Sequence, residues 1–303
     1  MPLSPIIFFG FNRPGHTLQT LSALKKARLS GDSELYIFLD GPKDGSSPEM
    51  LERINEVERV ALSENWCGKV HIKKSVSNRG LFRSIVSGIT EVIREHGRVI
   101  VLEDDVLVSP GFLEYMNDAL NFYEDNSRVM HISGYSRPDL KDAGIEEPTY
   151  FFFHTTCWGW ATWKRAWDLF DAEPLNVMRR VQQKGNIHLL NMDSTFEFFW
   201  GLKAISKNKF QSWNTIWHSV VFLNNGLSLH PADSLVDNIG HDGSGTNCEA
   251  GEDFHNDTLA DSVTVNPIPL KLHEGVRKKY NSLFTAGYRI RFRLRHYMRY
   301  LWN

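Results

Sequence analysis

The sequence predicts an α/β fold in which a mainly parallel β-sheet is flanked by helices. Short apolar runs alternate with longer segments whose apolar residues recur at helical spacing, and the links between them are short. A further apolar run ends abruptly in three carboxylates, Glu103, Asp104 and Asp105. Strands that alternate with helices favour right-handed crossovers, so neighbouring strands are expected to pair in parallel.

The elements follow in order along the chain. We expect strands at residues 6–11, 35–39, 70–76, 99–102 and 129–134. We expect helices at residues 16–28, 48–63, 81–95 and 112–124, each with apolar residues on one face. Residues 137–149 form a polar excursion. The composition then changes, because seven of the nine tryptophans lie between Trp158 and Trp217.

The bulk composition is that of an ordinary globular protein. The chain has 303 residues, 42% of them hydrophobic, and a formal net charge of −2. This length suits one large domain or two small ones. We divide it into an N-terminal half at residues 1–134, a second half of the same domain at 135–274, and a basic aromatic tail at 275–303.

Several function classes are disfavoured by what the sequence lacks. The three cysteines are widely spaced and form no CxxC pair, which indicates a reducing compartment and no zinc site. The N-terminal residues lack a signal-peptide pattern, and no apolar run is long enough to span a membrane. We therefore expect a cytoplasmic protein.

The three carboxylates after the fourth apolar run form the first candidate site. Acidic residues at the carboxyl end of a buried parallel strand lie where open α/β sheets hold their ligands. Adjacent carboxylates repel one another, and their desolvation is costly unless a cation neutralises them. Hard oxygen ligands suit Mg²⁺ or Mn²⁺. The alternative is a solvated acidic turn.

Polar residues that could contact a nucleotide follow the first three strands. Arginine side chains can bind a diphosphate bidentately, and a carboxylate can accept hydrogen bonds from a base or ribose. The polar candidates are Arg13, Asp40, Asn78, Arg79 and Arg83, and Phe11 at the end of the first strand is added as an apolar candidate. The alternative is that Asp40-Gly41 and Asn78-Arg79-Gly80 are simply turns, which these residue types favour. No GxGxxG motif and no P-loop follows the first strand, which disfavours a nicotinamide enzyme and a P-loop NTPase.

Two later segments suit a sugar substrate. Tryptophan rings can pack against the apolar faces of sugars, although most of these rings are expected to belong to an aromatic core. The segment from Asn238 to Asn247 contains glycines and small polar residues, so it can lie close to a phosphate or close over a substrate. His241 is the best-placed imidazole there for a metal or a diphosphate oxygen, and the alternative is a solvated loop histidine.

The C-terminal tail interleaves basic and aromatic residues. Eight lysines or arginines and no acidic residue follow Glu274. This pattern is typical of peripheral attachment to an anionic membrane surface. The alternatives are RNA binding, for which no recognition fold precedes the tail, and docking onto the protein's own acidic body.

These motifs together resemble GT-A fold glycosyltransferases, and most closely N-acetylglucosaminyltransferase I and its bacterial sugar-transferase relatives. The resemblance covers roughly residues 5 to 248. It is carried by the segments Val101-Leu102-Glu103-Asp104-Asp105, Trp158-Gly159-Trp160, Ser212-Trp213 to Trp217, Asn225-Gly226-Leu227 and Asn238 to Gly245.

The resemblance implies a nucleotide-sugar donor, here expected to be a UDP-sugar, with Mn²⁺ or Mg²⁺ bridging its diphosphate to the protein. It implies that residues 1–134 are the nucleotide-sugar-binding half and residues 135–274 the acceptor-binding half. Carried over by position, Asp105 is the direct metal ligand, Asp104 contacts the ribose or metal-bound water, and Glu103 contacts the donor sugar. Arg13 and Asp40 match positions that contact the nucleotide in the family. His241 matches a C-terminal histidine that many members bring to the metal or phosphate.

One position departs from the family pattern. Inverting members use a carboxylate to deprotonate the acceptor hydroxyl, and the matching segment here reads Ser212-Trp213-Asn214-Thr215. Asn214 cannot act as a base, because its amide is not basic. Asp193 and Glu197, just upstream, are the alternatives, with His218 behind them. The stereochemical course stays open, with inversion preferred.

The resulting hypothesis is a metal-dependent hexosyltransferase that acts on a glycan or lipid-linked acceptor in bacterial surface polysaccharide synthesis, such as lipopolysaccharide, on the inner face of the membrane. No nucleic-acid partner is expected, and the oligomeric state is left open. One alternative is a sugar-nucleotide nucleotidyltransferase, for which Asn12-Arg13-Pro14-Gly15 is a poor substitute for the usual basic glycine-rich loop. Another is a non-catalytic carbohydrate-binding protein on a transferase scaffold, which Asn214 would suit.

Overall fold

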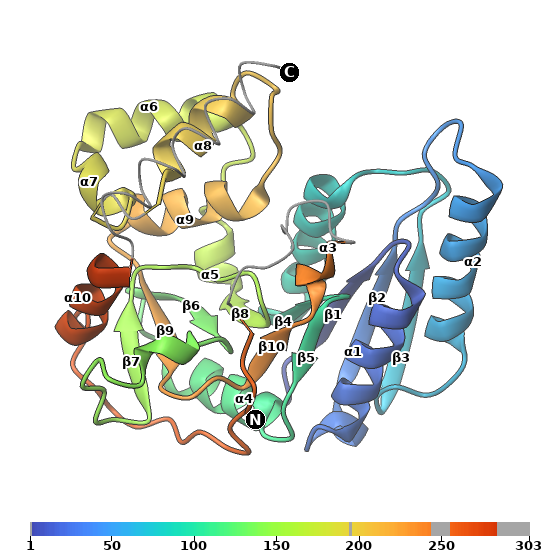
Figure 1. Cartoon of the computed structure of the whole chain (residues 1–303), viewed down its shortest axis with the longest axis horizontal. Coiled ribbons are helices and arrows are strands. Elements are labelled where there is room, and N and C mark those ends of the chain that lie inside the picture. Colours follow the sequence, from blue (N-terminus) through green and yellow to red (C-terminus); the bar gives the residue numbers. More distant parts are fainter. Residues whose placement is uncertain (1, 194–195, 244–254, 284–303) are drawn as a thin grey trace.

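The computed structural model describes residues 2–193, 196–243 and 255–283. Its first part confirms the expected alternation of strands and helices (Figure 1). The elements are β1 (Ile6–Gly10), α1 (Pro14–Lys26), β2 (Glu34–Leu39), α2 (Pro48–Leu62), β3 (Lys69–Lys74), α3 (Leu81–His96) and β4 (Arg98–Glu103). Expected and observed ends differ by at most two residues. For example, α1 begins at Pro14 because proline is favoured in the first turn of a helix.

One eight-stranded sheet organises the described chain, in the order β3-β2-β1-β4-β8-β6-β9-β7. The later strands are β6 (Val129–Ser133), β7 (Thr149–Phe152), β8 (Trp160–Trp163) and β9 (Leu227–Pro231). The pairs among β1 to β4 and the pair β6–β9 are parallel, whereas β8 runs antiparallel to both β4 and β6. The expected α/β class with a mainly parallel sheet is therefore confirmed, and an antiparallel strand stands at its centre.

Alternation along each strand divides the core into two layers. Ile6 and Phe8 of β1 pack with α1, α2 and α4 (Phe112–Phe122) on one face. Ile7 and Phe9 of the same strand pack with α3 on the other face. Because successive side chains of a strand point to opposite faces, a strand buried on both faces must be apolar throughout. This explains the continuous apolar runs in the sequence.

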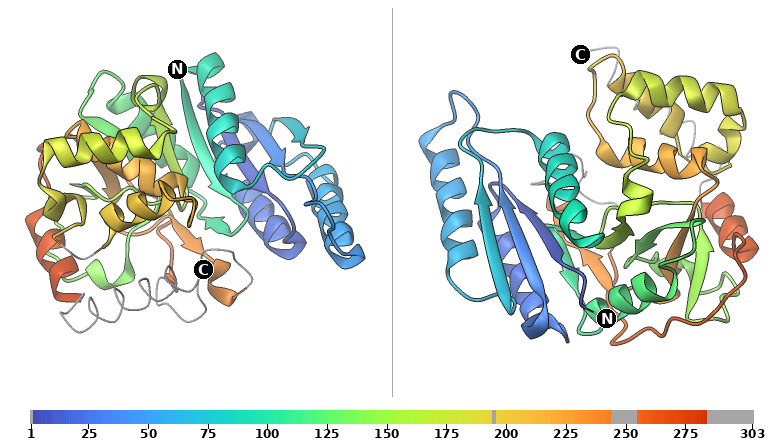
Figure 2. Two further views of the ribbon diagram at one scale, coloured as in Figure 1. Left: turned by 90° about the horizontal axis from the view of Figure 1, so that it is seen from above. Right: turned by 180° about the vertical axis from the view of Figure 1, so that it is seen from behind.

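A group of helices covers the second layer beyond α3. It contains α5 (Lys164–Trp167), α6 (Pro174–Lys184), α7 (Ile187–Leu190), α8 (Phe198–Ile205) and α9 (Trp213–Leu223). Figure 1 and both views of Figure 2 show α6, α8 and α9 lying together, apart from α1 and α2. Trp160 stacks on Trp213 with ring centroids 5.1 Å apart, and both rings are buried. The interpretation that most of these tryptophans are core residues is confirmed.

A small second sheet and a late helix complete the fold. β5 (Val106–Val108) pairs antiparallel with β10 (Val236–Asn238), which brings the acidic turn and a segment over 130 residues later side by side. Short 3₁₀ turns lie at Ser30–Asp32, Pro138–Leu140 and Gly240–Asp242, and α10 spans Glu274–Leu283.

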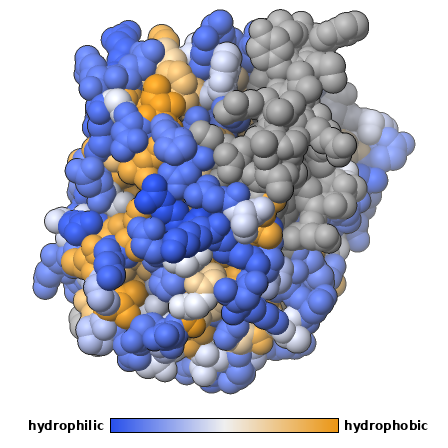
Figure 3. Space-filling model, turned by 60° about the vertical axis from the view of Figure 1, so that its left-hand side comes forward, coloured by the Kyte–Doolittle hydropathy of each residue, from blue (hydrophilic) through white to orange (hydrophobic). Residues whose placement is uncertain are grey.

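The surface shown in Figure 3 is mainly hydrophilic, with apolar residues in separate groups. Among the described residues, no helix combines the length and the apolarity needed to cross a bilayer. The expected domain division at residue 134 falls within the one continuous sheet, and it stays a prediction.

Candidate functional site

The acidic turn lies at the carboxyl end of β4, as expected. Glu103 is the last residue of β4, and its Cα partner in β1 is Phe9. Asp104 and Asp105 follow in a turn before β5 begins. Because β1 and β4 are parallel neighbours, the turn lies beside the residues that leave β1 and enter α1. The fold thus brings residues near position 13 to residues near position 104.

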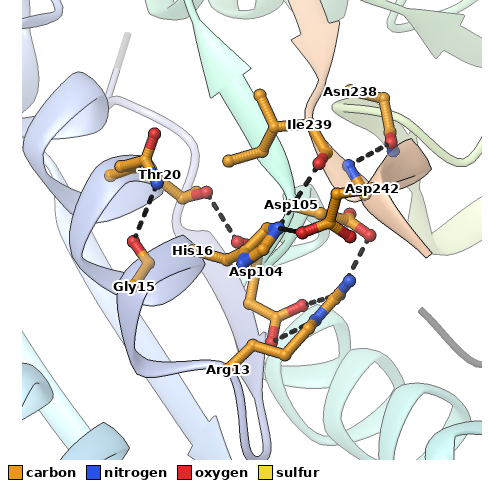
Figure 4. A network of polar contacts seen from close by, with 11 residues as sticks. Arg13, Gly15, His16, Thr20, Asp104, Asp105, Asn238, Ile239 and Asp242 are labelled. Atoms are coloured by element: carbon orange, nitrogen blue, oxygen red, sulfur yellow. Dashed lines mark hydrogen bonds and ion pairs between the residues drawn. The ribbon is translucent and has the colours of Figure 1, made fainter. Parts of the chain in front are cut away.

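Arg13 lies directly on the two aspartates (Figure 4). Its Nε donates to Oδ2 of Asp104 at 3.3 Å, and its Nη2 donates to Oδ1 of Asp104 and, at 2.9 Å, to Oδ2 of Asp105. Asp104 and Asp105 are 6% and 8% exposed. A buried pair of carboxylates needs a counter-charge, and here the guanidinium supplies it.

The protonation of these groups follows from burial and from one another's charge. Burial raises the pKa of Asp104 to about 6, against the opposing effect of Arg13. Burial, followed by the charges of Asp105 and Asp104, raises the pKa of Glu103 well above its usual range. Burial alone would lower the pKa of Arg13, but the two aspartates outweigh burial and hold that pKa above its ordinary value. Glu103 is therefore the carboxyl best suited to remain protonated near neutral pH.

The segment after β10 packs against Asp105. Ile239 N donates to the backbone oxygen of Asp105 at 2.9 Å, and Gly240 N donates to Oδ1 of Asn238 at 2.8 Å. A Cβ atom at Gly240 would lie 2.4 Å from Oδ2 of Asp105. Such a contact is too short, so residue 240 must be glycine for the backbone to approach the carboxylate this closely.

The first turns of α1 contribute further contacts. Thr20 Oγ1 donates to the backbone oxygen of Asp104 at 2.8 Å. His16 Nε2 lies 3.3 Å from the backbone oxygen of Ile239 and 3.3 Å from the carboxylate of Asp242. The sequence interpretation missed His16, Thr20 and Asp242. A signal was present, because residues 13, 16 and 20 are spaced by three and four and so share one helix face.

His241 lies in the same segment, within the turn Gly240–Asp242. Its ring meets the ring of Trp158 edge-on, with centroids 5.6 Å apart, and Trp158 in turn meets Tyr135 edge-on at 4.6 Å. An aromatic wall therefore stands next to the acidic turn. The rest of the expected glycine-rich loop, from Ser244 to Asn247, lies outside the described residues.

Asp40 organises the turn after β3. Its Oδ1 accepts hydrogen bonds from the backbone N–H groups of Gly41 and Arg79 at 2.9 and 2.8 Å. Its Oδ2 accepts from Nδ2 of Asn78 and from the N–H of Gly80, both at 3.0 Å. These four bonds match the turn alternative for both segments. Contact of Asp40 with a nucleotide stays a prediction.

The remaining nucleotide candidates lie at the ends of β1 and β3. Phe11 is half-buried directly after β1. Arg79 and Arg83 are exposed at the start of α3, and in the described part of the chain neither side chain has a hydrogen bond or ion pair. These two cations remain available to a phosphate.

Asp193 is bound by residues of α10, away from the acidic turn. Arg277 of α10 donates to both of its oxygens, from Nε at 2.5 Å and from Nη2 at 2.9 Å, and Asn281 donates at 3.2 Å. The hydrogen bond from Arg277 leads the effects that lower the pKa of Asp193. The residue follows α7, and Figure 1 shows α7 and α10 at one side of the molecule, away from β4 and β5. The structure does not bring Asp193 to the acidic turn, and its ion pair disfavours the role of base.

The other candidate bases lie in the helical group. Glu197 is half-buried and precedes α8 as its N-cap residue. Oδ1 of Asn214, in the first turn of α9, accepts a hydrogen bond from Thr155 at 3.3 Å. His218 is buried, its Nε2 lies 3.0 Å from the backbone oxygen of Leu190, and burial lowers its pKa to about 4. The identity of the base stays a prediction.

The aspartate pair fits a divalent cation in chemistry but is engaged by Arg13. Mg²⁺ is commonly held by one or two carboxylates together with substrate phosphates. Within the described ranges, no group of three or more His, Cys, Asp or Glu residues is arranged to hold a metal ion. Asp104 and Asp105 are therefore the residues of the described chain that would contribute to such a site, and Arg13 occupies their oxygens in this structure.

Comparisons with known proteins add little to this geometry. No protein-family model matches the chain, and no curated protein matches its sequence. Solved structures with some similarity include S. aureus TarS, at 14% identity and a TM-score of 0.30, over 43% of this chain and 21% of TarS. An active-site mutant of LgtC has 13% sequence identity and a TM-score of 0.37, over 72% of this chain and 70% of LgtC.

UDP-glucose pyrophosphorylase, solved with UDP-glucose, reaches 10% identity and a TM-score of 0.35 over 55% of this chain and 78% of its own. Similarities of this size carry no conclusion about the activity of this chain.

Proposed function

We propose that this protein is a glycosyltransferase that transfers a sugar from a nucleotide-sugar donor, specifically a UDP-sugar, to a hydroxyl of a glycan or lipid-linked acceptor. The observation that carries the proposal is the buried aspartate pair at the end of β4, contacted by Arg13 and covered by residues 238–242. Acidic and basic groups at the carboxyl ends of parallel strands suit a nucleoside diphosphate with its cation.

The roles follow the geometry and the resemblance. Asp105 would hold Mn²⁺ or Mg²⁺, Asp104 would contact the ribose or metal-bound water, and Glu103 the donor sugar. Arg13, Arg79 and Arg83 would bind phosphate oxygens, and His241 would approach the diphosphate from the covering segment. When bound, the cation supplies positive charge that stabilises the nucleoside diphosphate leaving group.

The acceptor hydroxyl requires a general base. Glu197 is the preferred base among the three candidates, because Asp193 is saturated by Arg277 and Asn214 has no basic group. An inverting course remains the proposal. Synthesis of a bacterial surface polysaccharide at the inner face of the membrane also remains a proposal.

Membrane attachment through the tail is proposed for residues that mostly lie outside the described ranges. At the beginning of the basic segment, Arg277 pairs with Asp193 and Lys279 pairs with Asp142. These contacts favour the alternative that basic residues of α10 dock onto the protein's own acidic body. A chain ending at residue 283 should leave the membrane fraction if the tail is the anchor, and an unchanged distribution would reject that part.

The donor is identified by a thermal-shift panel of nucleotide sugars with and without Mn²⁺. A ligand that binds only the folded state raises the melting temperature, so the nucleotide can be identified without the acceptor. We expect UDP-sugars with Mn²⁺ to give the largest shift and Asp105→Asn to lose it. Equal shifts for all nucleotides, or none, would reject the proposed donor.

A non-catalytic sugar-binding protein is the second candidate, favoured by Asn214 and by the engagement of Asp193. Release of free UDP from a UDP-sugar in the presence of Mn²⁺ separates the two. A transferase releases UDP slowly even without acceptor and stops when Asp105 is replaced by asparagine, whereas a binding protein releases none.

A further inference from the structure

Arg13 satisfies two carboxylates with only part of its guanidinium. Nε and Nη2 contact Asp104 and Asp105, whereas the buried Nη1 has no hydrogen-bond partner among the described residues. A buried N–H group without an acceptor is costly. The side chain is therefore neutralising the aspartates while one of its strongest donors still lacks an acceptor.

Asn238, in the segment that packs against Asp105, also has a buried donor without a hydrogen-bond partner among the described residues. Its side chain is buried, with the residue 2% exposed, and its Oδ1 accepts the bond from Gly240 N. Its Nδ2 is buried and without a partner in the part of the chain that the structure describes. Arg13 and Asn238 thus each keep a buried donor without a partner next to the acidic turn, and an acceptor-rich group such as a phosphate could satisfy such donors.

A divalent cation and Arg13 cannot both use the same aspartate oxygens. The guanidinium contacts both oxygens of Asp104 and Oδ2 of Asp105. A cation that binds these oxygens must displace it, because two positive groups in contact with one buried pair would repel each other. Arg13 is the N-cap residue of α1 and precedes Pro14, which restricts its backbone. Displacement of the guanidinium would therefore use the side-chain torsions.

We propose that Arg13 and a divalent cation are alternative counter-ions of the Asp104–Asp105 pair, and that binding of the metal–nucleotide complex transfers the Arg13 guanidinium from the carboxylates to the diphosphate. The metal-exchange half of this proposal stands without the proposed function, whereas the transfer to a diphosphate rests on it. One arginine thus stabilises the empty site and binds the ligand.

The exchange couples metal and nucleotide binding. Free Mn²⁺ binds weakly because it must displace Arg13 without providing a new anion for it. With the nucleotide present, the diphosphate accepts the guanidinium, so each ligand strengthens the binding of the other by the same factor.

The test is a titration of Mn²⁺ alone, read by the electron paramagnetic resonance signal of free Mn²⁺. We expect Arg13→Gln to bind Mn²⁺ about tenfold more tightly than the wild type, within the usual range of coupling between sites. Arg13→Lys retains the charge and should stay near the wild type. Arg59→Gln is the control, because it removes an exposed Arg–Glu52 ion pair elsewhere. Equal Mn²⁺ affinity in Arg13→Gln and the wild type would overturn the exchange.

A second titration uses UDP in saturating Mn²⁺. Arg13→Gln should then bind UDP about tenfold more weakly than the wild type, because it lacks the transferred guanidinium. Unchanged UDP affinity overturns the transfer and leaves the metal exchange intact. If UDP and UDP-sugars bind neither protein while the Mn²⁺ result holds, the proposed function fails and the exchange stands.

If Arg13→Gln does not fold, the proposal can be tested on the wild-type protein by NMR. The Nε–Hε resonance of Arg13, assigned by its absence from Arg13→Lys, should shift when Mg²⁺ and UDP are added together. A resonance that does not move at saturating ligand overturns the proposal.

Discussion

Gly240 shows how a single residue position limits the site. Its Cα faces Asp105 so closely that a methyl group would lie 2.4 Å from Oδ2 of Asp105 and 3.1 Å from Oδ1 of Asn238. Neither neighbour can easily yield, since Asp105 also contacts Arg13 and Asn238 also accepts the Gly240 N–H. Any side chain here disturbs the acidic turn and its covering segment together.

Gly240→Ala is therefore expected to lower the free energy of unfolding by about 1–3 kcal/mol, the usual cost of overpacking. Donor binding should weaken as well. Gly15→Ala is the matched control, because a Cβ atom at Gly15 meets nothing within 4 Å. Urea unfolding of both variants measures the difference, and equal stabilities would contradict the close contact.

Residue-scale reasoning from sequence reached part of this site. The three acids, Arg13 and His241 could be found because their residue types and positions at strand ends indicate chemistry. The ion pair between Arg13 and Asp104 could not, since the two residues are 91 positions apart and each was assigned to a ligand. Only the parallel pairing of β1 and β4 brings them together.

At the scale of elements, hydrogen bonds to Asp193 connect the end of α7 with α10. Asp193 adopts a left-handed backbone conformation with φ +56°, which brings its carboxylate to Arg277 and Asn281 of α10. Aspartate and asparagine tolerate this conformation better than most residues. The geometry explains the residue type at position 193 without a catalytic role.

Asp193→Asn keeps that tolerance but removes the charge that Arg277 binds. We expect a loss of about 1–3 kcal/mol in unfolding free energy, as for a hydrogen bond to a charged group, with unchanged donor binding. Asp142→Asn, which breaks the exposed ion pair with Lys279, should lose nothing measurable. Loss of turnover at full stability would instead make Asp193 the base.

The elements themselves were predictable where their pattern is local. Helices and strands up to β4 were located within two residues, because each carries its own apolar period. The antiparallel β8 was not foreseen. It has four residues and pairs with strands that are distant in sequence, so no local period identifies it.

For the molecule as a whole, four histidines with lowered pKa values contribute to how stability responds to acid. Burial lowers the pKa of His218 and of His230 to about 4, against backbone hydrogen bonds that oppose it. Burial and neighbouring imidazoles lower the pKa of His131 and His154 well below the usual value. In the unfolded chain each returns to about 6.5.

Between about pH 6.5 and 4 the unfolded chain therefore binds more protons at these positions than the folded protein does. The contribution of these histidines to stability is fully present above this window. It falls as the pH is lowered through the window, by roughly 3 kcal/mol at most for each of His218 and His230. Asp104 works in the opposite direction, since burial raises its folded pKa to about 6 and protonation relieves that cost.

Urea unfolding at pH 7.5, 6 and 5 measures how steeply the free energy of unfolding falls as the pH is lowered. His218→Gln, whose amide can still donate to Leu190, should flatten this slope. An identical slope in this variant would show that His218 takes no part in the acid response.

The central position of β8 has a consequence for synthesis on the ribosome. The four parallel strands β1 to β4 are complete once residue 103 has emerged, but the strand that pairs with the other edge of β4 begins only at Trp160. During that interval Val99, Ile100 and Val101 form an open apolar edge, which is a template for pairing with other chains. Chains interrupted between β4 and β8 should therefore aggregate, whereas complete chains protect that edge within their own sheet.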